Sequence, residues 1–291
     1  MKESAALRSG KGSGDENFPV ASLLIARRHR PAVLAFYEFV RVADDIADHA
    51  SLPPEEKLAR LDRMEAALLG RTNAEPQGVH LRAVLAERRL SPVHAQDLLR
   101  AFRQDVTKLR YTDWDDLIEY CRYSAMPVGR YVLDVHGESQ TTWPANDALC
   151  AALQIINHLQ DCAKDYRALN RVYIPQDALA AQGLTVEALD GPVASPALRR
   201  CISEVAGRTA RLLEESQPFA SLIRDRRLAM EVAAIQKLAE RLVLVLMQRD
   251  PLSERVHLRK WQMLMTGASG AAVGLWSSLF ARKAPSSAFG W

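Results

Sequence analysis

Apolar side chains recur every three or four positions along most of this chain. Val33, Tyr37 and Val40, for example, share one helical face with Asp44. No reliable run shows the period of two that is typical of half-buried strands. The pattern predicts helices over residues 31–49, 54–69, 78–89, 92–109, 113–136, 145–167, 197–214, 218–248 and 253–280.

The main interruption of this pattern is the segment 171–196, in which prolines and glycines surround a short helix. It is too short to serve as an interdomain linker. We therefore expect one all-α domain that closes around a single core.

Composition narrows the class of protein further. Of 291 residues, 48% are apolar and 25% are charged, which excludes collagen-like, low-complexity and wholly disordered chains. The net charge of +3 is too small to predict a nucleic-acid partner. The four cysteines form no C-x-x-C pair and show no zinc-site spacing, which favours a reduced, cytoplasmic protein.

The two ends of the chain differ from the part between them. Residues 1–16 are small and polar without an apolar run, so we expect a flexible tail and no secretory signal. The segment 261–291 forms the C-terminal region, after the tail 1–16 and the part between them, and its residues 261–281 carry no charged side chain. This stretch is long enough to span a membrane, but its polar side chains and glycines argue against a span. Two alternatives remain. The stretch is either a packed terminal helix or tail, or an element that lies on the inner face of the membrane, where Arg282 and Lys283 would suit anionic headgroups.

Paired carboxylates are the strongest chemical signal in the sequence. Asp44 and Asp48 lie four residues apart, so they project from one face of a helix that is otherwise apolar. Two carboxylates on an inward face repel each other and need a cation. Oxygen ligands of this kind suit Mg²⁺, which shares its coordination shell with substrate phosphates. A solvated acidic face is the alternative for either pair alone.

A second helix repeats this arrangement. Gln154, Asn157, Asp161 and Asp165 follow one another at spacings of three, four and four. If the two acidic helices face each other across a cavity, a ligand with two linked phosphates would satisfy all four carboxylates through bridging Mg²⁺ ions. The combination is far more specific than either pair.

These motifs resemble those of the squalene and phytoene synthases, which are prenyl transferases of the isoprenoid synthase fold. The resemblance lies in the segments 17–48, 120–129 and 154–175, and it covers the chain from about 17 to 260. It implies an all-α fold with a central cavity, two aspartate motifs that bind Mg²⁺ and diphosphate, and a prenyl diphosphate substrate.

Residue roles follow from the resemblance position by position. It makes the four aspartates catalytic and implies the metal ligands Asp44, Asp48, Asn157, Asp161 and Asp165. It implies substrate contacts at Asn17, Phe18, Tyr37, Arg41, Gln154, Asn157, Arg171 and Tyr173. Candidates for shielding a carbocation with the negative faces of their rings are Phe36, Tyr37, Tyr120 and Tyr123.

Some positions depart from the common family pattern. The run 124–130, together with 16–20 and 255–258, is similar to the bacterial hydroxysqualene synthases of this family. Gln160 stands where many relatives have an arginine, Lys164 stands where they often have an acid, and no tyrosine follows Tyr173. These departures argue against the first half-reaction of the family, the condensation of two prenyl diphosphates, more than against the binding of metal or diphosphate.

The resemblance implies ionisation of presqualene diphosphate and capture of the cation by water. The expected partners are then the enzymes that make this substrate and that reduce the alcohol product. A synthase that condenses two prenyl diphosphates to presqualene diphosphate, squalene or phytoene is the alternative in the same class. A non-catalytic helical relative and a diphosphate hydrolase are alternatives of other classes.

Overall fold

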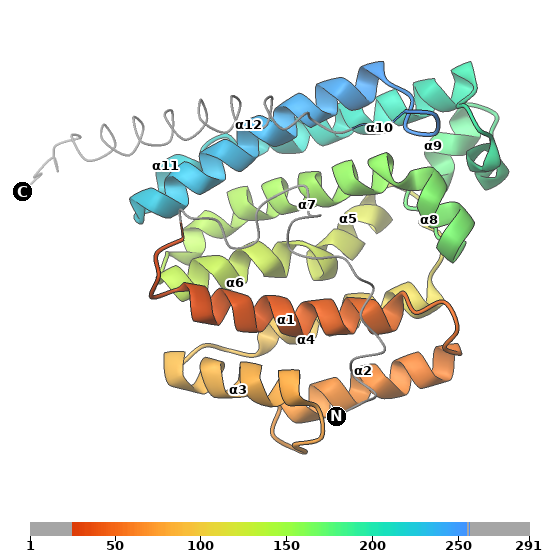
Figure 1. The fold of residues 1–291 in the computed structure, drawn as a ribbon. Coiled ribbons are helices and arrows are strands. Elements are labelled where there is room, and N and C mark those ends of the chain that lie inside the picture. The colour runs from red at the N-terminus through yellow and green to blue at the C-terminus, as the bar shows by residue number, and fades with distance from the viewer. Residues whose placement is uncertain (1–24, 255, 257–291) are drawn as a thin grey trace, which may run out of the picture.

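The protein is a stack of helices, shown in Figure 1 by a computed structural model that describes residues 25–254 and 256. Over these residues no strand occurs, and an isolated bridge joins Arg110 to Val172. The all-α expectation is therefore confirmed. The α-helices are α1 (Arg30–Ala47), α2 (Pro54–Leu68), α3 (Pro76–Arg88), α4 (Val93–Thr107), α5 (Trp114–Ser124), α6 (Met126–His136), α7 (Trp143–Gln160), α8 (Cys162–Leu169), α9 (Gln176–Ala181), α10 (Pro196–Glu215), α11 (Phe219–Leu222) and α12 (Arg226–Gln248). Two 3₁₀ turns, η1 (Gln140–Thr142) and η2 (Val186–Asp190), complete them.

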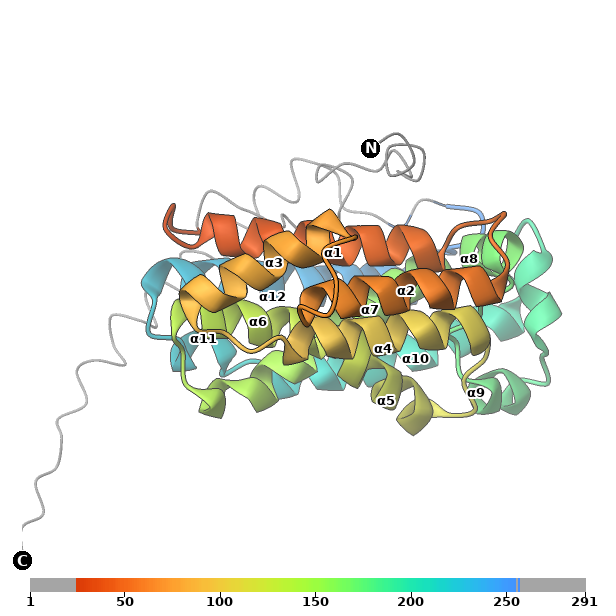
Figure 2. The ribbon, with the colours of Figure 1, turned by 90° about the horizontal axis from the view of Figure 1, so that it is seen from below.

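The helices form tiers whose axes run roughly side by side (Figures 1 and 2). Helices α1 to α4 pack together and bury one cluster of apolar side chains. Helix α7 packs between α6 on one side and α10 and α12 on the other, around a second cluster. Tyr131 of α6 belongs to the first cluster, stacks on Phe36 and donates a hydrogen bond to the carbonyl oxygen of Ala32. Helix α6 therefore joins the two halves.

Three of the predicted helices are broken in the structure. The predicted helix 113–136 divides at Ala125, because Pro127 follows in the first turn of α6 and has no N–H to continue the ladder. The predicted helix 218–248 divides before Asp225, whose carboxylate accepts hydrogen bonds from two amides at the start of α12. The predicted helix 145–167 divides at Asp161.

Several expectations fall outside the described residues. They are the contacts of Asn17 and Phe18, the tail 1–16, the helix 253–280 beyond residue 256, and the segment 261–291. Among the helices that the structure does describe, none combines the length and the hydropathy that crossing a bilayer requires.

Gly129 brings helices α6 and α7 into close contact. A Cβ atom at this position would lie 2.0 Å from Oδ1 of Asn146 and 2.7 Å from Sγ of Cys150, both on α7. Real Cβ atoms essentially never show such distances. Any side chain at position 129 must therefore displace the side chains of Asn146 and Cys150 or move the two helices apart.

We expect Gly129→Ala to lower the free energy of unfolding by about 1–3 kcal/mol, the usual cost of overpacking. Gly207 in α10 is a matched control, because a Cβ there meets only Met247 Cε at 3.6 Å. Gly207→Ala should raise stability by up to ~1 kcal/mol through helix propensity. Urea unfolding followed by circular dichroism measures both, and equal effects would contradict the assigned close contact.

Candidate active site

An apolar cavity of about 290 Å³ lies between α1, α6, α7 and α12. Its size is near the lower end of the range for small-molecule pockets, roughly 300–1,000 Å³. Phe36, Tyr37 and Val40 line it from α1, and Asn157 lines it from α7. Val40 and Asn157 each precede a predicted metal-binding aspartate by four residues. At the ends of both α1 and α7, the first aspartate of the motif therefore lies one helical turn beyond a residue that lines the cavity.

The first aspartate motif lies at the carboxyl end of α1. Arg41 Nη1 donates to Asp44 Oδ2 at 2.5 Å, and Arg41 Nη2 contacts Asp45 Oδ1 at 3.3 Å. Burial raises the pKa of Asp44 to about 7, and the neighbouring charge of Asp48 raises it too, whereas Arg41 opposes the shift. The protein thus holds the carboxylates of Asp44 and Asp48 close together, although the guanidinium of Arg41 does not fully offset burial and their mutual repulsion.

The second aspartate motif lies where α7 ends and α8 begins. Asp161 is the junction residue, yet its amide still bonds to the carbonyl of Asn157, and the amide of Asp165 bonds to the carbonyl of Asp161. The i to i−4 pattern thus continues across the break. Burial raises the pKa of Asp165 to about 7, with a further rise from Asp161 and from Asp48 on α1. The two motifs therefore interact electrostatically across the site.

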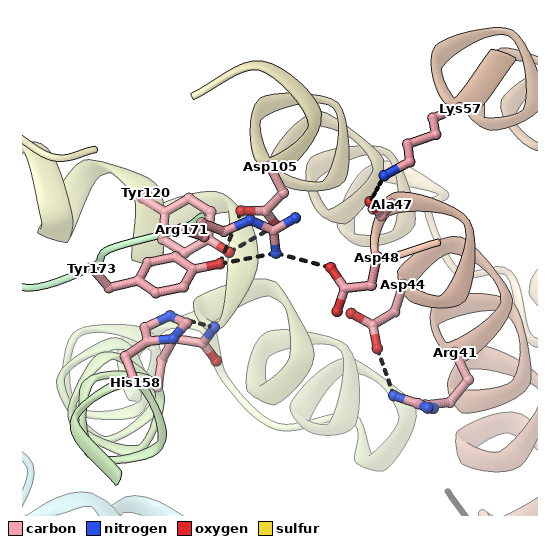
Figure 3. Close-up of polar contacts among 11 residues, drawn as sticks. Arg41, Asp44, Ala47, Asp48, Lys57, Asp105, Tyr120, His158, Arg171 and Tyr173 are labelled. Atoms are coloured by element: carbon pink, nitrogen blue, oxygen red, sulfur yellow. Dashed lines mark hydrogen bonds and ion pairs between the residues drawn. The ribbon is translucent and has the colours of Figure 1, made fainter. Parts of the chain in front are cut away.

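Arg171 connects the first aspartate motif to a buried group of tyrosines and Asp105 (Figure 3). Its side chain is 7% exposed, and its Nη1 donates to Asp48 Oδ1 at 2.9 Å and to Tyr173 Oη at 3.3 Å. Tyr173 and Tyr120 in turn donate their hydroxyl protons to the two carboxylate oxygens of Asp105, at 3.2 and 2.9 Å. Every link in this chain is buried or half-buried, so Arg171 is fixed in position from behind.

Backbone hydrogen bonds to a segment about sixty residues earlier in the chain hold the segment that carries Arg171. The amide of Val172 bonds to the carbonyl of Leu109, and the amide of Gln176 bonds to that of Tyr111. These bonds flank the isolated bridge between Arg110 and Val172. The segment is consequently extended and pinned against the α4–α5 connection.

The charges of this network follow from burial. Burial raises the pKa of Asp105 to about 6, while Arg171 and the hydrogen bond from Tyr120 oppose the rise. Burial also lowers the pKa of His158 to about 3, and the charge of Arg171 lowers it further. His158 is therefore neutral, accepts a hydrogen bond from Gln154 at 3.0 Å, and stacks on Tyr173 with ring centroids 3.4 Å apart.

The structure brings most of the predicted residues to one end of the cavity. The aspartates, Arg41, Arg171 and Tyr173 lie there, and Tyr37 and Asn157 line the adjoining wall. Gln154 contacts the site through His158. Of the four candidate aromatics, Tyr120 and Tyr123 are not among the cavity-lining residues. The hydroxyl of Tyr120 donates to Asp105, and the ring of Tyr123 lies under the guanidinium of Arg100 at 3.9 Å.

Sequence reasoning missed Asp105, His158 and Lys57. Asp105 continues the buried stripe of α4 after Leu98 and Ala101, so the argument applied to Asp44 could have found it. His158 follows Gln154 by four residues. No sequence signal marks Lys57, whose Nζ donates to the last carbonyl of α1, that of Ala47, at 2.9 Å (Figure 3).

The donor set fits magnesium. The carboxylates supply oxygen ligands only, which Mg²⁺ prefers. Burial raises the pKa values of Asp44 and Asp165, the neighbouring carboxylates raise them further, and a divalent cation bound there would favour the ionised forms. Three ion pairs compete for the same carboxylates: Arg41 with Asp44, Arg171 with Asp48 at 2.9 Å, and Lys164 with Asp161 at 3.7 Å.

Helices stacked around an apolar cavity with carboxylates at one end define a protein of the isoprenoid synthase fold. The chain belongs to the squalene/phytoene synthase family, whose model matches residues 12–262. The resemblance inferred from the aspartate motifs is thereby confirmed.

Close relatives in sequence cover nearly the whole chain. The hydroxysqualene synthase of Rhodopseudomonas palustris is 58% identical over 283 residues, which are 97% of this chain and 95% of the relative. The hydroxysqualene synthase of Zymomonas mobilis is 52% identical over 275 residues, 94% of this chain and 93% of the relative. Identity at this level extends well beyond the motifs.

Solved structures share the fold. The squalene synthase HpnC from Alicyclobacillus acidocaldarius superposes with a TM-score of 0.70 at 32% identity, covering 84% of this chain and 91% of that one. A dehydrosqualene synthase in complex with a ligand superposes with a TM-score of 0.77 at 21% identity, covering 94% and 96%. The second likeness concerns the fold alone.

Proposed function

We propose that this protein is a hydroxysqualene synthase, which converts presqualene diphosphate and water to hydroxysqualene and diphosphate with Mg²⁺ as cofactor. The observation that carries the proposal is the position of two aspartate motifs and Arg171 at one end of an apolar cavity. Identities of 58% and 52% to relatives with this name support the choice within the family.

The polar end of the cavity would bind the diphosphate. Mg²⁺ bound there would act as a Lewis acid that takes up the charge of the leaving diphosphate. Asp44, Asp48, Asp161 and Asp165, with Asn157, are the residues that would hold it. The guanidinium of Arg171 is already fixed by Asp48 and Tyr173, so it can stabilise developing negative charge with little reorganisation.

The apolar part of the cavity would bind the hydrocarbon. Heterolysis of the carbon–oxygen bond leaves both electrons on the diphosphate and a carbocation on the prenyl skeleton. Phe36 and Tyr37 line the wall that this cation would face, where the negative faces of their rings can stabilise it. Addition of water to the rearranged cation and loss of one proton then give the alcohol.

Product analysis tests the proposal. We expect the purified protein to convert presqualene diphosphate to an alcohol in the presence of Mg²⁺ and without a nicotinamide, and to lose this activity when the metal is chelated. Farnesyl diphosphate, supplied alone, should not be consumed. Gas chromatography with mass spectrometry identifies the products.

Three results would contradict the proposal in different ways. Conversion of farnesyl diphosphate to presqualene diphosphate, squalene or a longer analogue would make the protein a condensing synthase. Turnover of neither substrate, in a sample with intact helical circular dichroism, would favour the non-catalytic alternative. Release of inorganic phosphate with presqualene monophosphate, or formation of unrearranged presqualene alcohol in place of hydroxysqualene, would favour a hydrolase.

The proposed product also bears on where the protein works. A C30 alcohol is almost insoluble in water, so its release into a bilayer is physically favourable. We therefore propose a cytoplasmic protein that contacts the inner membrane face, with the segment 261–281 as the candidate contact. The enzymes that supply presqualene diphosphate and reduce hydroxysqualene are its proposed partners.

A further inference from the structure

Three potential metal ligands gather at the opposite end of the cavity from the aspartates. His29 directly precedes α1, His136 is the last residue of α6, and Asp225 caps α12. One ligand atom from each lies within 4.8 Å of the other two. His29 and Asp44 are 15 residues apart along α1, which corresponds to about 22 Å of helix. The group is therefore separate from the proposed diphosphate site.

These residues border the cavity on three segments. Ile25, Val132 and Leu228 line the cavity wall. His29 and His136 follow the first two of these by four residues, and Asp225 precedes Leu228 by three. In Figure 1 the start of α1 and the start of α12 lie at the same end of the molecule, beside α11. The cluster therefore lies one helical turn or less beyond residues that line this end of the cavity.

A cation already occupies the space between two of the ligands. Arg28 Nε donates to Nε2 of His29 at 2.9 Å, and its Nη2 lies 3.9 Å from Oδ2 of Asp225. The side chain of Arg28 is 74% exposed. The guanidinium therefore marks a position that attracts positive charge, and it can leave for solvent without disturbing the core.

The histidine nitrogens are available for coordination. Nδ1 of His136 lies 2.8 Å from the carbonyl oxygen of Val132, which only accepts, so this nitrogen carries the proton and Nε2 has the lone pair. Metal-binding histidines usually make such a second bond. Nδ1 of the 7%-exposed His29 has no hydrogen-bond partner. Metal binding through either nitrogen of His29 would therefore break no hydrogen bond of this ring other than the one from Arg28.

The carboxylate of Asp225 and the neutral ring of His29 also favour metal binding. Oδ1 of Asp225 accepts from the amides of Arg227 and Leu228, which leaves Oδ2 facing the cluster. Burial lowers the pKa of His29, and the positive charge of Arg28 lowers it further. The ring is consequently neutral near pH 7, as a metal ligand must be.

We propose that His29, His136 and Asp225 bind one divalent transition-metal ion of the zinc class, which replaces the guanidinium of Arg28. Two imidazoles and one carboxylate suit Zn²⁺ or Co²⁺, whereas Mg²⁺ prefers oxygen ligands. With metal–ligand bonds of about 2.0–2.1 Å, each side chain has to move inward by roughly 1 Å or less. The ion would join α1, α6 and α12, and it would fix the end of the cavity that is far from the aspartates.

Metal binding can be measured independently of enzyme activity. We expect isothermal titration of the full chain with Zn²⁺, in excess Mg²⁺ to occupy the oxygen sites, to give one ion per chain. Zn²⁺ at about 100-fold excess over its Kd should raise the Tm by roughly 5 °C. Co²⁺ in its place should give visible ligand-field absorption.

Three variants decide the outcome. His136→Asn should weaken Zn²⁺ binding at least ~10-fold, and Arg28→Ala should strengthen it by up to ~5-fold because the competing cation is gone. The matched control His80→Asn, an exposed histidine of α3 with a side chain 57% exposed, should bind as the parent does. Unchanged affinity in both cluster variants would overturn the proposal, and so would equal weakening in His80→Asn, which indicates adventitious binding. Failure of the proposed enzyme activity would leave these results unaffected.

Discussion

Asp44→Asn is expected to lower turnover of presqualene diphosphate by about 10³-fold, corresponding to several kcal/mol of lost transition-state stabilisation. The same substitution should raise the melting temperature of the metal-free protein. Asparagine keeps the shape of the side chain but removes one of the charges that repel each other at this end of the cavity. The raised pKa of Asp44 reflects burial and the charge of Asp48, so the protein bears a cost for keeping Asp44 ionised.

The direction of the stability change follows from the pKa. A carboxyl group whose folded pKa lies above its unfolded value favours folding most at low pH, and this contribution is lost as pH rises through the folded value. For Asp44 the loss falls between about 4 and 7, so at pH 8 the carboxylate destabilises the metal-free fold. Arg41 keeps its contact with Asp45 in the variant.

Thermal unfolding at pH 8 in a chelator, compared with activity in Mg²⁺, measures both effects. We expect the Tm to rise by about 2–4 °C, which corresponds to ~1 kcal/mol in a chain of this size. Asp62→Asn is the control, since Asp62 is a surface aspartate 67% exposed and paired with Arg103. It should change neither quantity appreciably. A variant that is less stable yet fully active would refute the assigned role of Asp44.

Arg171→Met is expected to lower the free energy of unfolding by about 3–5 kcal/mol, because it leaves buried carboxylates without their cation. Burial disfavours the charged guanidinium, but Tyr173, Asp105 and Asp48 outweigh it and raise the pKa of Arg171. Without Arg171, the 5%-exposed Asp105 retains its two tyrosine donors but has no positive charge beside it. Turnover of presqualene diphosphate by Arg171→Met should fall by about 10²–10³-fold, which is the usual effect of losing one electrostatic donor.

A double substitution separates this charge effect from lost packing. Asp105→Asn in the Arg171→Met background should restore stability by about 1–3 kcal/mol, since the uncompensated charge is removed. Activity should not return, because the diphosphate would still lack its arginine. Arg103→Met is the matched control. Arg103 bonds to Asp62 and Glu65 at the surface, so its loss should cost no more than ~1 kcal/mol. Additive effects of the two substitutions in urea unfolding would show that Arg171 and Asp105 do not act as a pair.

The sequence carries most of the information for the helices but less for the points where they bend. Periodicity located α1, α2 and α10 to within a residue or two, because each presents a continuous apolar stripe. The breaks at Ala125 and Asp161 were missed, since the apolar pattern continues through both. At Ala125 the break follows from Pro127 in the first turn of α6, and at Asp161 the i to i−4 hydrogen bonds continue, so neither break alters the spacing of the apolar residues.

The site was predictable where its residues share one helix. Asp44 and Asp48, or Gln154 and Asn157, are recognisable as pairs through their spacing. The contact between Arg171 and Asp48 joins positions 123 residues apart, and that between Asp105 and Tyr173 spans 68. No local pattern encodes such pairings, which only the tertiary packing of α1, α4 and the 171–176 segment creates.

The pinned segment around Val172 also sets when the site forms during folding. Its bonds to Leu109 and Tyr111 close a loop of about sixty residues that contains α5 to α8. Contacts of high sequence separation incur their loop-closure entropy before they contribute stability, and they form late on a folding pathway. We therefore expect the ion pair between Arg171 and Asp48 to form after this loop has closed. A partly folded chain that possesses the helices but lacks these backbone bonds would then also lack this arrangement of charges beside the cavity.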